Sequence, residues 1–200
     1  LSTVPDYTKY VTSCDTLKAR EDKQGVLLSV GNTKGTDDAL FVFDPLCPAC
    51  KAFHKRIAES RFASSMSYKL LLMPLDAECN WMLKDSMHPG ACLLSRALLC
   101  AGDKTGSMLD FMFENQETMR MDGLGKKIDA IRDRIVGKYP EIKECIDSQD
   151  TKIRLNKALH YAVANSLPVL TPQLYLNGKR MCDEDTDLGL DFTLTKLLAK

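Results

Sequence analysis

The sequence predicts an α/β fold in which a long helical segment interrupts a sheet before its closing hairpin. Three observations predict it. The apolar run 39–43 leads directly into a Cys-x-x-Cys pair and a helix-like stretch. Residues 76–166 carry helical patterns and no strand signal. Asn177-Gly178, finally, separates two short strand-like runs and has the turn chemistry of a β-hairpin.

The composition suits one domain, or one domain that carries an insertion. The chain has 200 residues, of which 44% are hydrophobic, and no apolar run approaches the ~18 residues of a membrane span. No signal-peptide pattern stands at Leu1, and because the chain opens on Leu rather than Met we expect a processed or truncated product. Lys plus Arg and Asp plus Glu both number 27, so the formal charge is zero. Since there is no concentrated basic stripe either, the sequence indicates no nucleic-acid partner.

The part of the chain before residue 76 predicts three strands and a central helix. Strands are expected over 25–30, 39–43 and 68–73, a helix over 48–62, and a short helix near 7–19 in an otherwise irregular arm. The run 39–43 is apolar on both faces, as in a central strand of a covered sheet. Pro48 suits the first turn of a helix, where its missing N–H costs little, and Pro74 ends the third strand.

The rest of the chain predicts helices, then a hairpin and a last helix. Helical patterns cover 82–83, 92–100, 109–119, 124–136, 142–148, 153–165 and 188–198, and strands are expected over 173–176 and 179–182. Met108, Met112 and Met119 recur at helical spacing, which favours core packing over a ligand groove.

This order of elements is that of a thioredoxin-like fold with a helical insertion between the third strand and the hairpin. We expect an N-terminal arm over 1–24, a thioredoxin-like subdomain built from 25–75 and 167–200, and an inserted helical subdomain over 76–166. The sheet is then completed only after the insertion, because its hairpin lies beyond residue 166.

Cys47 and Cys50 are the candidate redox pair. A strand that delivers two thiols to the start of a helix has the geometry for reversible disulfide chemistry. The positive end of the helix stabilises a thiolate on Cys47, and Cys50 lies one turn inside the helix, close enough to close a disulfide. Cys47 would be the exposed sulfur attacked in exchange, and Cys50 the buried resolving thiol. A purely structural disulfide is the alternative.

The chain contains eight cysteines, an even number spread widely along the sequence. Such a pattern fits structural disulfides in an oxidising compartment, and the cysteines outside the candidate pair leave many pairings open. Reduced, buried thiols in a cytosolic protein are the alternative. We expect no metal, because no second Cys-x-x-Cys or His pair at ligand spacing completes a zinc site.

From residue 25 to 200 the sequence resembles the DsbA branch of the thioredoxin superfamily. Three features carry the resemblance: Cys47-Pro48-Ala49-Cys50 after a buried strand, Thr171-Pro172 before the strand and turn 173–179, and the helical insertion. The resemblance implies a thiol–disulfide oxidoreductase that binds no cofactor and works through its redox-active disulfide Cys47–Cys50.

The resemblance also implies a role for Thr171-Pro172. Pro172 would be cis and would place the Thr171 backbone beside Cys47, where it can pair with an extended substrate segment. An ordinary trans proline at the start of a strand is the alternative.

The helical segment narrows the resemblance. Residues 76–82, 88–92 and 99–101 are similar to DsbA-like domains linked to bacterial vitamin K epoxide reductase homologues. This implies reduced or unfolded exported proteins as substrates, and reoxidation by a membrane quinone reductase of the vitamin K epoxide reductase or DsbB type, fused or separate. It also implies a periplasmic or otherwise extracytoplasmic location, with a membrane part missing on the N-terminal side. The oligomeric state stays open.

For the remaining cysteines we expect three structural disulfides. Cys79–Cys92 and Cys100–Cys145 would staple the insertion, and Cys14–Cys182 would tie the N-terminal arm to the hairpin. Each native disulfide of this kind typically contributes ~2–4 kcal/mol to stability.

Two departures from the family pattern limit what the resemblance implies. Ala49 stands where strongly oxidising members have His, and it can neither donate a hydrogen bond nor carry a charge. We therefore predict a less oxidising pair. Phe41 stands where many thioredoxin-like proteins have a buried acid that helps to move the proton of the buried thiol. Water, Asp44 or Glu78 could take that role.

The histidines and an acidic run add weaker candidates. His54 could share a helical face with the cysteine pair and tune the thiolate, or it could be a solvated surface residue. His88 and His160 are interpreted as structural or exposed. The run 183–187 could attract a cation, or form a solvated turn before the last helix.

Together these observations predict an enzyme that forms disulfides in exported proteins. The alternatives are a disulfide reductase or isomerase, and a peptide-binding module whose pair is structural. A redox potential near ~−120 mV would indicate the oxidant and one near ~−270 mV the reductant.

Overall fold

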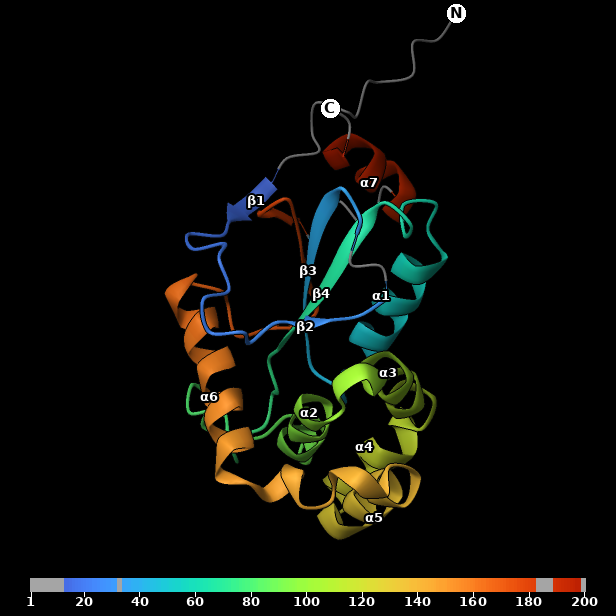
Figure 1. Cartoon of the computed structure of the whole chain (residues 1–200), viewed down its shortest axis with the longest axis vertical. Helices are drawn as coiled ribbons and strands as arrows, with labels where there is room; N and C mark the ends of the chain where they lie inside the picture. Colours follow the sequence, from blue (N-terminus) through green and yellow to red (C-terminus); the bar gives the residue numbers. More distant parts are fainter. Residues whose placement is uncertain (1–12, 32–33, 183–188, 199–200) are drawn as a thin grey trace, which may run out of the picture.

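The computed structural model describes residues 13–31, 34–182 and 189–198, which form a mixed six-stranded sheet covered by helices (Figure 1). The strands are β1 (Ser13–Thr16), β2 (Leu28–Ser29), β3 (Asp37–Phe43), β4 (Met66–Leu72), β5 (Gln173–Leu176) and β6 (Lys179–Met181). Their order across the sheet is β1-β6-β5-β3-β4-β2. β3 pairs in parallel with β4 and antiparallel with β5, so it occupies the middle of the sheet. The thioredoxin-like fold with a helical insertion is therefore confirmed.

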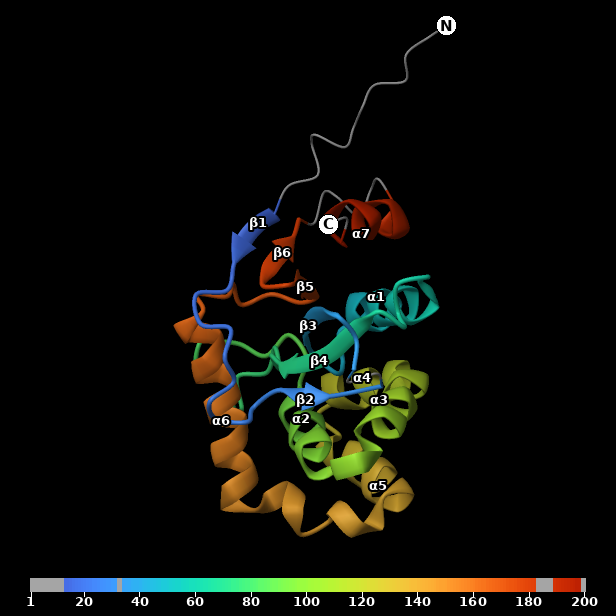
Figure 2. The same ribbon diagram turned by 45° about the horizontal axis from the view of Figure 1, so that its top comes forward.

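Seven α-helices are described: α1 (Pro48–Glu59), α2 (Ala91–Cys100), α3 (Thr105–Glu114), α4 (Gln116–Leu124), α5 (Ile128–Lys138), α6 (Gln149–Ala164) and α7 (Leu190–Leu198). Short 3-10 turns cover Gly102–Lys104, Pro140–Ile142 and Cys145–Asp147. Figures 1 and 2 show α2–α5 gathered at the end of the molecule opposite α7. None of the helices in the described part of the chain has the length and apolar character needed to cross a bilayer.

Alternating side chains of β3 place the sheet between two apolar clusters. Phe41 and Phe43 belong to the larger cluster, which α1 and the helices of the insertion complete. Leu40 and Val42 face the smaller cluster, which is closed by α6. Because neighbouring residues of a strand point to opposite faces, the apolar run forms a strand buried on both sides, as the sequence predicted. The larger cluster contains Met108, Met112 and Met119, so these methionines are core residues.

Several local predictions were wrong. The sequence suggested a helix near 7–19, of which 7–12 lie outside the described residues. The described part contains a strand, β1, which pairing with β6 holds extended. The first expected strand shortens to the two residues of β2. Residues 82–83 and 142–148 form turns rather than α-helices. The helix expected over 109–119 breaks at Asn115, whose side chain donates to the Phe111 carbonyl oxygen at 2.9 Å and so offers the backbone an alternative to a continuous helix.

Three disulfides cross-link the chain: Cys14–Cys182, Cys79–Cys92 and Cys100–Cys145. These are the three pairs that we expected from the sequence. The first joins β1 to the segment after β6, and the other two lie within the insertion. Cys47 and Cys50 are left as free thiols.

Close packing of α4 against the segment before α2 supplies a test of this fold. A Cβ added at Gly123 would meet the Pro89 carbonyl oxygen at 2.0 Å. Gly123→Ala should therefore lower the free energy of unfolding by about 2 kcal/mol, because the cost of moving backbone exceeds the ~1 kcal/mol that Ala gains over Gly in a helix. Urea denaturation measures the effect.

Gly137→Ala in α5 is the matched control. Apart from its chain neighbours and the nearby backbone of α5 itself, an added Cβ there would meet no atom within 4 Å. We expect this variant to gain roughly 0.5–1 kcal/mol of stability. Equal changes in the two variants would contradict the close approach of α4 to Pro89.

Candidate functional site

Cys47 and Cys50 lie where β3 delivers the chain to α1. Cys47 occupies the N-cap position of α1 and Pro48 its first turn. Cys47 is 6% exposed and Cys50 is fully buried. The sulfur of Cys47 thus lies at the helix end where free N–H groups favour a negative charge, and Cys50 lies behind it.

The turn that carries Cys47 is held by two buried polar side chains. The Asp44 carboxylate, which is fully buried, accepts hydrogen bonds from the backbone N–H groups of Leu46 and Leu75, both at 2.6 Å. Gln116, at the start of α4, donates through Nε2 to the carbonyl oxygens of Pro45 at 2.9 Å and Cys47 at 3.0 Å. The insertion therefore fixes the active-site turn directly.

Hydrogen bonding favours a thiolate on Cys47. A hydrogen bond from the Cys50 thiol is the largest effect and lowers the pKa of Cys47 to about 6, from an ordinary value near 9. Burial acts in the opposite direction, and so, more weakly, does the charge of Asp44. The Cys50 backbone N–H assists the lowering. A sulfur that is ionised near neutral pH is both a good nucleophile and a good leaving group.

Cys50 behaves in the opposite way. Burial is the largest effect and raises the pKa of Cys50 far above its ordinary range, and the neighbouring Cys47 thiolate adds to the rise. One thiol of the pair therefore holds its proton while the other releases it. This asymmetry divides the pair into an attacking or leaving sulfur and a resolving sulfur.

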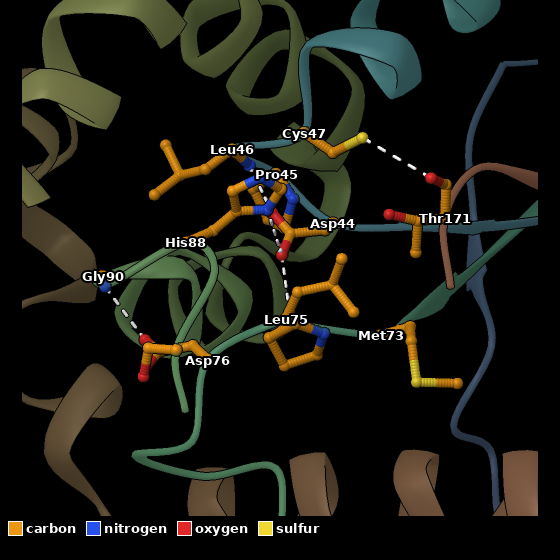
Figure 3. A network of polar contacts seen from close by, with 12 residues as sticks. Asp44, Pro45, Leu46, Cys47, Met73, Leu75, Asp76, His88, Gly90 and Thr171 are labelled. Atoms are coloured by element: carbon orange, nitrogen blue, oxygen red, sulfur yellow. Dashed lines mark hydrogen bonds and ion pairs between the residues drawn. The ribbon is translucent and has the colours of Figure 1, made fainter. Parts of the chain in front are cut away.

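The segment before β5 lies beside Cys47. The Thr171–Pro172 peptide bond is cis. The Cys47 thiol donates to the Thr171 carbonyl oxygen across 3.7 Å, and Figure 3 shows the sulfur pointing toward this residue. A groove of about 400 Å³ runs alongside, lined by side chains that include Ala49, Phe53, Arg56, Leu170, Pro172 and Met181.

Phe41 leaves no acid at the position where many thioredoxin-like proteins have one. Its ring is fully buried and stacks on Phe43, Phe53 and Tyr68. Of the two carboxylates considered for proton transfer, Asp44 lies in the active-site turn. Glu78 instead pairs with Arg96 at 3.0 Å and is 56% exposed.

The structure tests the sequence interpretation of the three histidines. His54 is not a solvated surface residue: it is partly buried, its ring lies against Tyr68 and Phe113, and burial lowers its pKa. Tuning of the thiolate by His54 stays a prediction. His160 is exposed beside Trp81. His88 lies beneath the active-site turn, with Nδ1 3.0 Å from Asp44 Oδ2. Sequence reasoning missed this contact, because no local pattern links His88 to Asp44.

One group of potential metal ligands occurs among the described residues. It consists of Glu78, Cys79 and Cys92. Because the two sulfurs form a disulfide, they are not thiolate ligands. The acidic run 183–187, a candidate cation site in the sequence, lies outside the described residues.

Comparison with solved structures places the fold in a class. A protein-disulfide isomerase from Novosphingobium aromaticivorans superposes with a TM-score of 0.61 at 10% identity, over 87% of this chain and 98% of that one. Oxidised BdbD from Bacillus subtilis superposes with a TM-score of 0.58 at 16% identity, over 94% of this chain and 98% of that one. DsbA from Xylella fastidiosa superposes with a TM-score of 0.50 at 18% identity, over 87% of this chain and 96% of that one. Neither the protein-family models nor the curated proteins gave a match.

These superpositions establish a thioredoxin-like fold of the DsbA type. They extend over the insertion as well as the sheet, because each covers most of both chains. The chain therefore combines a DsbA-type thioredoxin-like fold with a pair of thiols at the start of α1.

Proposed function

We propose that this protein is a thiol–disulfide oxidoreductase that forms disulfides in reduced exported proteins through Cys47 and Cys50. The observation that carries the proposal is the opposite behaviour of the two thiols. The pKa of Cys47 is lowered to about 6 and that of Cys50 is raised. A disulfide that serves only to stabilise the fold does not require its two thiols to differ in pKa.

The reaction begins on the oxidised pair. A substrate thiolate attacks Sγ of Cys47, the Cys47–Cys50 bond breaks, and Cys50 takes up a proton. A second substrate thiolate then attacks the substrate sulfur of the mixed disulfide, and Cys47 leaves as a thiolate. Two electrons pass from the substrate to the pair. The low pKa of Cys47 favours the second step, because a more acidic thiol leaves faster.

The groove beside Cys47 suits an extended, partly apolar substrate segment. Apolar side chains of Phe53, Leu170 and Met181 line it, and Leu170 is 39% exposed. The backbone around Thr171 offers hydrogen-bonding groups to such a segment, as in strand addition to a sheet edge. Contacts of this kind recognise an unfolded chain rather than one sequence.

The direction of electron flow and the partners belong to the same proposal. A low pKa on Cys47 stabilises the reduced pair and so makes its disulfide more oxidising, whereas Ala49 contributes no charge or donor to that effect. Three further disulfides support an extracytoplasmic location. A membrane quinone reductase of the vitamin K epoxide reductase or DsbB type would reoxidise the pair.

Two measurements test the proposal. The oxidised protein should accelerate disulfide formation in a reduced, unfolded test protein and be left reduced in equal amount. Equilibration of the Cys47–Cys50 pair with glutathione then gives its potential. A value near ~−120 mV supports the oxidant, and a value near ~−270 mV would assign a reductase instead. Absence of exchange in both directions would leave only a binding module.

A further inference from the structure

The charge of the Asp44 carboxylate disfavours the Cys47 thiolate on which the proposed function depends. It is fully buried, and its charge acts against a thiolate on Cys47, three residues further along the same turn. Two backbone N–H groups solvate it, but they do not cancel its charge. A turn that must carry a thiolate above a buried anion needs a compensating cation.

His88 is the group in place to supply that cation. Its Nδ1 lies 3.0 Å from Asp44 Oδ2, and its side chain is 14% exposed (Figure 3). At this distance a protonated His88 forms an ion pair with Asp44. Such a contact is strongest when the imidazole is protonated.

The loop that carries His88 is built to hold it there. The Leu75 carbonyl oxygen accepts from the backbone N–H groups of Met87 at 2.9 Å and His88 at 3.0 Å. Asp76, also buried, accepts from Gly90 at 2.9 Å and from the Cys92 backbone at 3.2 Å. The Cys79–Cys92 disulfide closes the same loop. The position of His88 is therefore determined by fixed backbone, not by the ion pair alone.

Three titratable or charged groups act on His88. Burial is the largest effect and by itself lowers its pKa, but the contact with Asp44, helped by the Cys47 thiolate, outweighs burial and raises the pKa. Arg120 on α4 acts weakly in the opposite direction. Protonation of His88 and ionisation of Cys47 therefore favour one another.

We infer that His88 is a positioning residue of the redox pair, whose imidazolium, held beneath the turn, neutralises Asp44 and so stabilises the Cys47 thiolate. This inference rests on the proposed function and extends it. In the reduced protein the His88 imidazolium then lies near two anions, the Asp44 carboxylate and the Cys47 thiolate. In the disulfide form it lies near the Asp44 carboxylate alone. His88 should accordingly bind its proton more tightly when the pair is reduced.

The first test follows the ultraviolet absorbance of the Cys47 thiolate against pH in the reduced protein. His88→Gln should raise the midpoint by about one pH unit, because the Asp44 charge is left uncompensated. Adding Asp44→Asn should move the midpoint back toward the wild-type value, which a merely structural role of His88 would not do. His160→Gln, which changes an exposed histidine on α6, is the control and should leave the midpoint unchanged. An unchanged midpoint in His88→Gln, or an equal shift in the control, would overturn the inference.

A second measurement needs no substitution at the site. Nuclear magnetic resonance titration of His88 in the wild-type protein should give a higher midpoint in the reduced than in the oxidised form, since coupling between the two groups is reciprocal. Equal midpoints would refute the inference. Neither readout requires a substrate. If exchange activity is absent while these shifts occur, the proposed function falls and the His88 inference stands; if activity is present and the shifts are absent, the reverse holds.

Discussion

Replacing Cys47 by Ala should reduce disulfide exchange to the uncatalysed background, whereas Cys50→Ala should stop the reaction as a mixed disulfide on Cys47. The difference follows from position. Cys47 caps α1 beside the groove, and Cys50 is fully buried behind it. A sulfur of the substrate can therefore reach only Cys47. In Cys50→Ala the Cys47 thiolate attacks a substrate disulfide and one substrate thiolate leaves, but no internal thiol remains to resolve the mixed disulfide.

The two variants are distinguished by non-reducing electrophoresis after mixing with a test protein that carries one activated disulfide. Cys50→Ala should give a covalent adduct that a reductant releases, and Cys47→Ala should give none. The double variant Cys100→Ala, Cys145→Ala is the matched control, because it removes two cysteines of the insertion and leaves the pair intact. We expect it to lose ~3–4 kcal/mol of stability and to keep exchange activity. An adduct formed by Cys47→Ala would contradict the assignment of roles.

The second large effect is the pH dependence of the reduced protein. Because the pKa of Cys47 is about 6 in the folded state and near 9 when unperturbed, the folded state is stabilised by ionisation of this thiol. For an acid with a lowered pKa, this stabilisation is fully present above the unfolded value and is lost as the pH falls through the folded value. Between the folded and the unfolded pKa, each pH unit adds ~1.4 kcal/mol to the free energy of unfolding. Because pH 7 lies about one unit above the folded pKa, ionisation of Cys47 contributes ~1.4 kcal/mol there.

Urea unfolding of the reduced wild type and of Cys47→Ser, between about pH 5 and pH 9, measures this contribution. The stability advantage of the wild type should grow across the range and vanish at the acid end. Alkylation of Cys47 by iodoacetamide should rise with the same midpoint, near pH 6, as the thiolate forms. Parallel stability curves for the two proteins would show that the Cys47 thiol is unperturbed.

Much of the fold could be predicted because its signals are local. The run 39–43 has the apolar character of a doubly covered strand, and Asn177-Gly178 has the chemistry of a tight turn. Both elements appear in the structure where the sequence predicted them. The predictions that were wrong concerned short segments with weak sequence patterns. β1 is held extended by its pairing with β6, and the Cys14–Cys182 disulfide joins the same two segments. The pairing brings together residues far apart in the chain, so the sequence around β1 does not show it.

The candidate site divides in the same way. Cys47 and Cys50 are three residues apart at the start of a helix, so the sequence by itself determined that the thiol pair is present. It also determined that Pro48 stands in the first helical turn and that position 41 carries Phe rather than an acid. Only the tertiary structure decided what surrounds the pair. Gln116 reaches the turn from α4, and His88 reaches Asp44 from the segment before α2. Contacts of this kind join residues far apart in the chain, and their energies depend on burial and distance, which no periodicity or motif encodes.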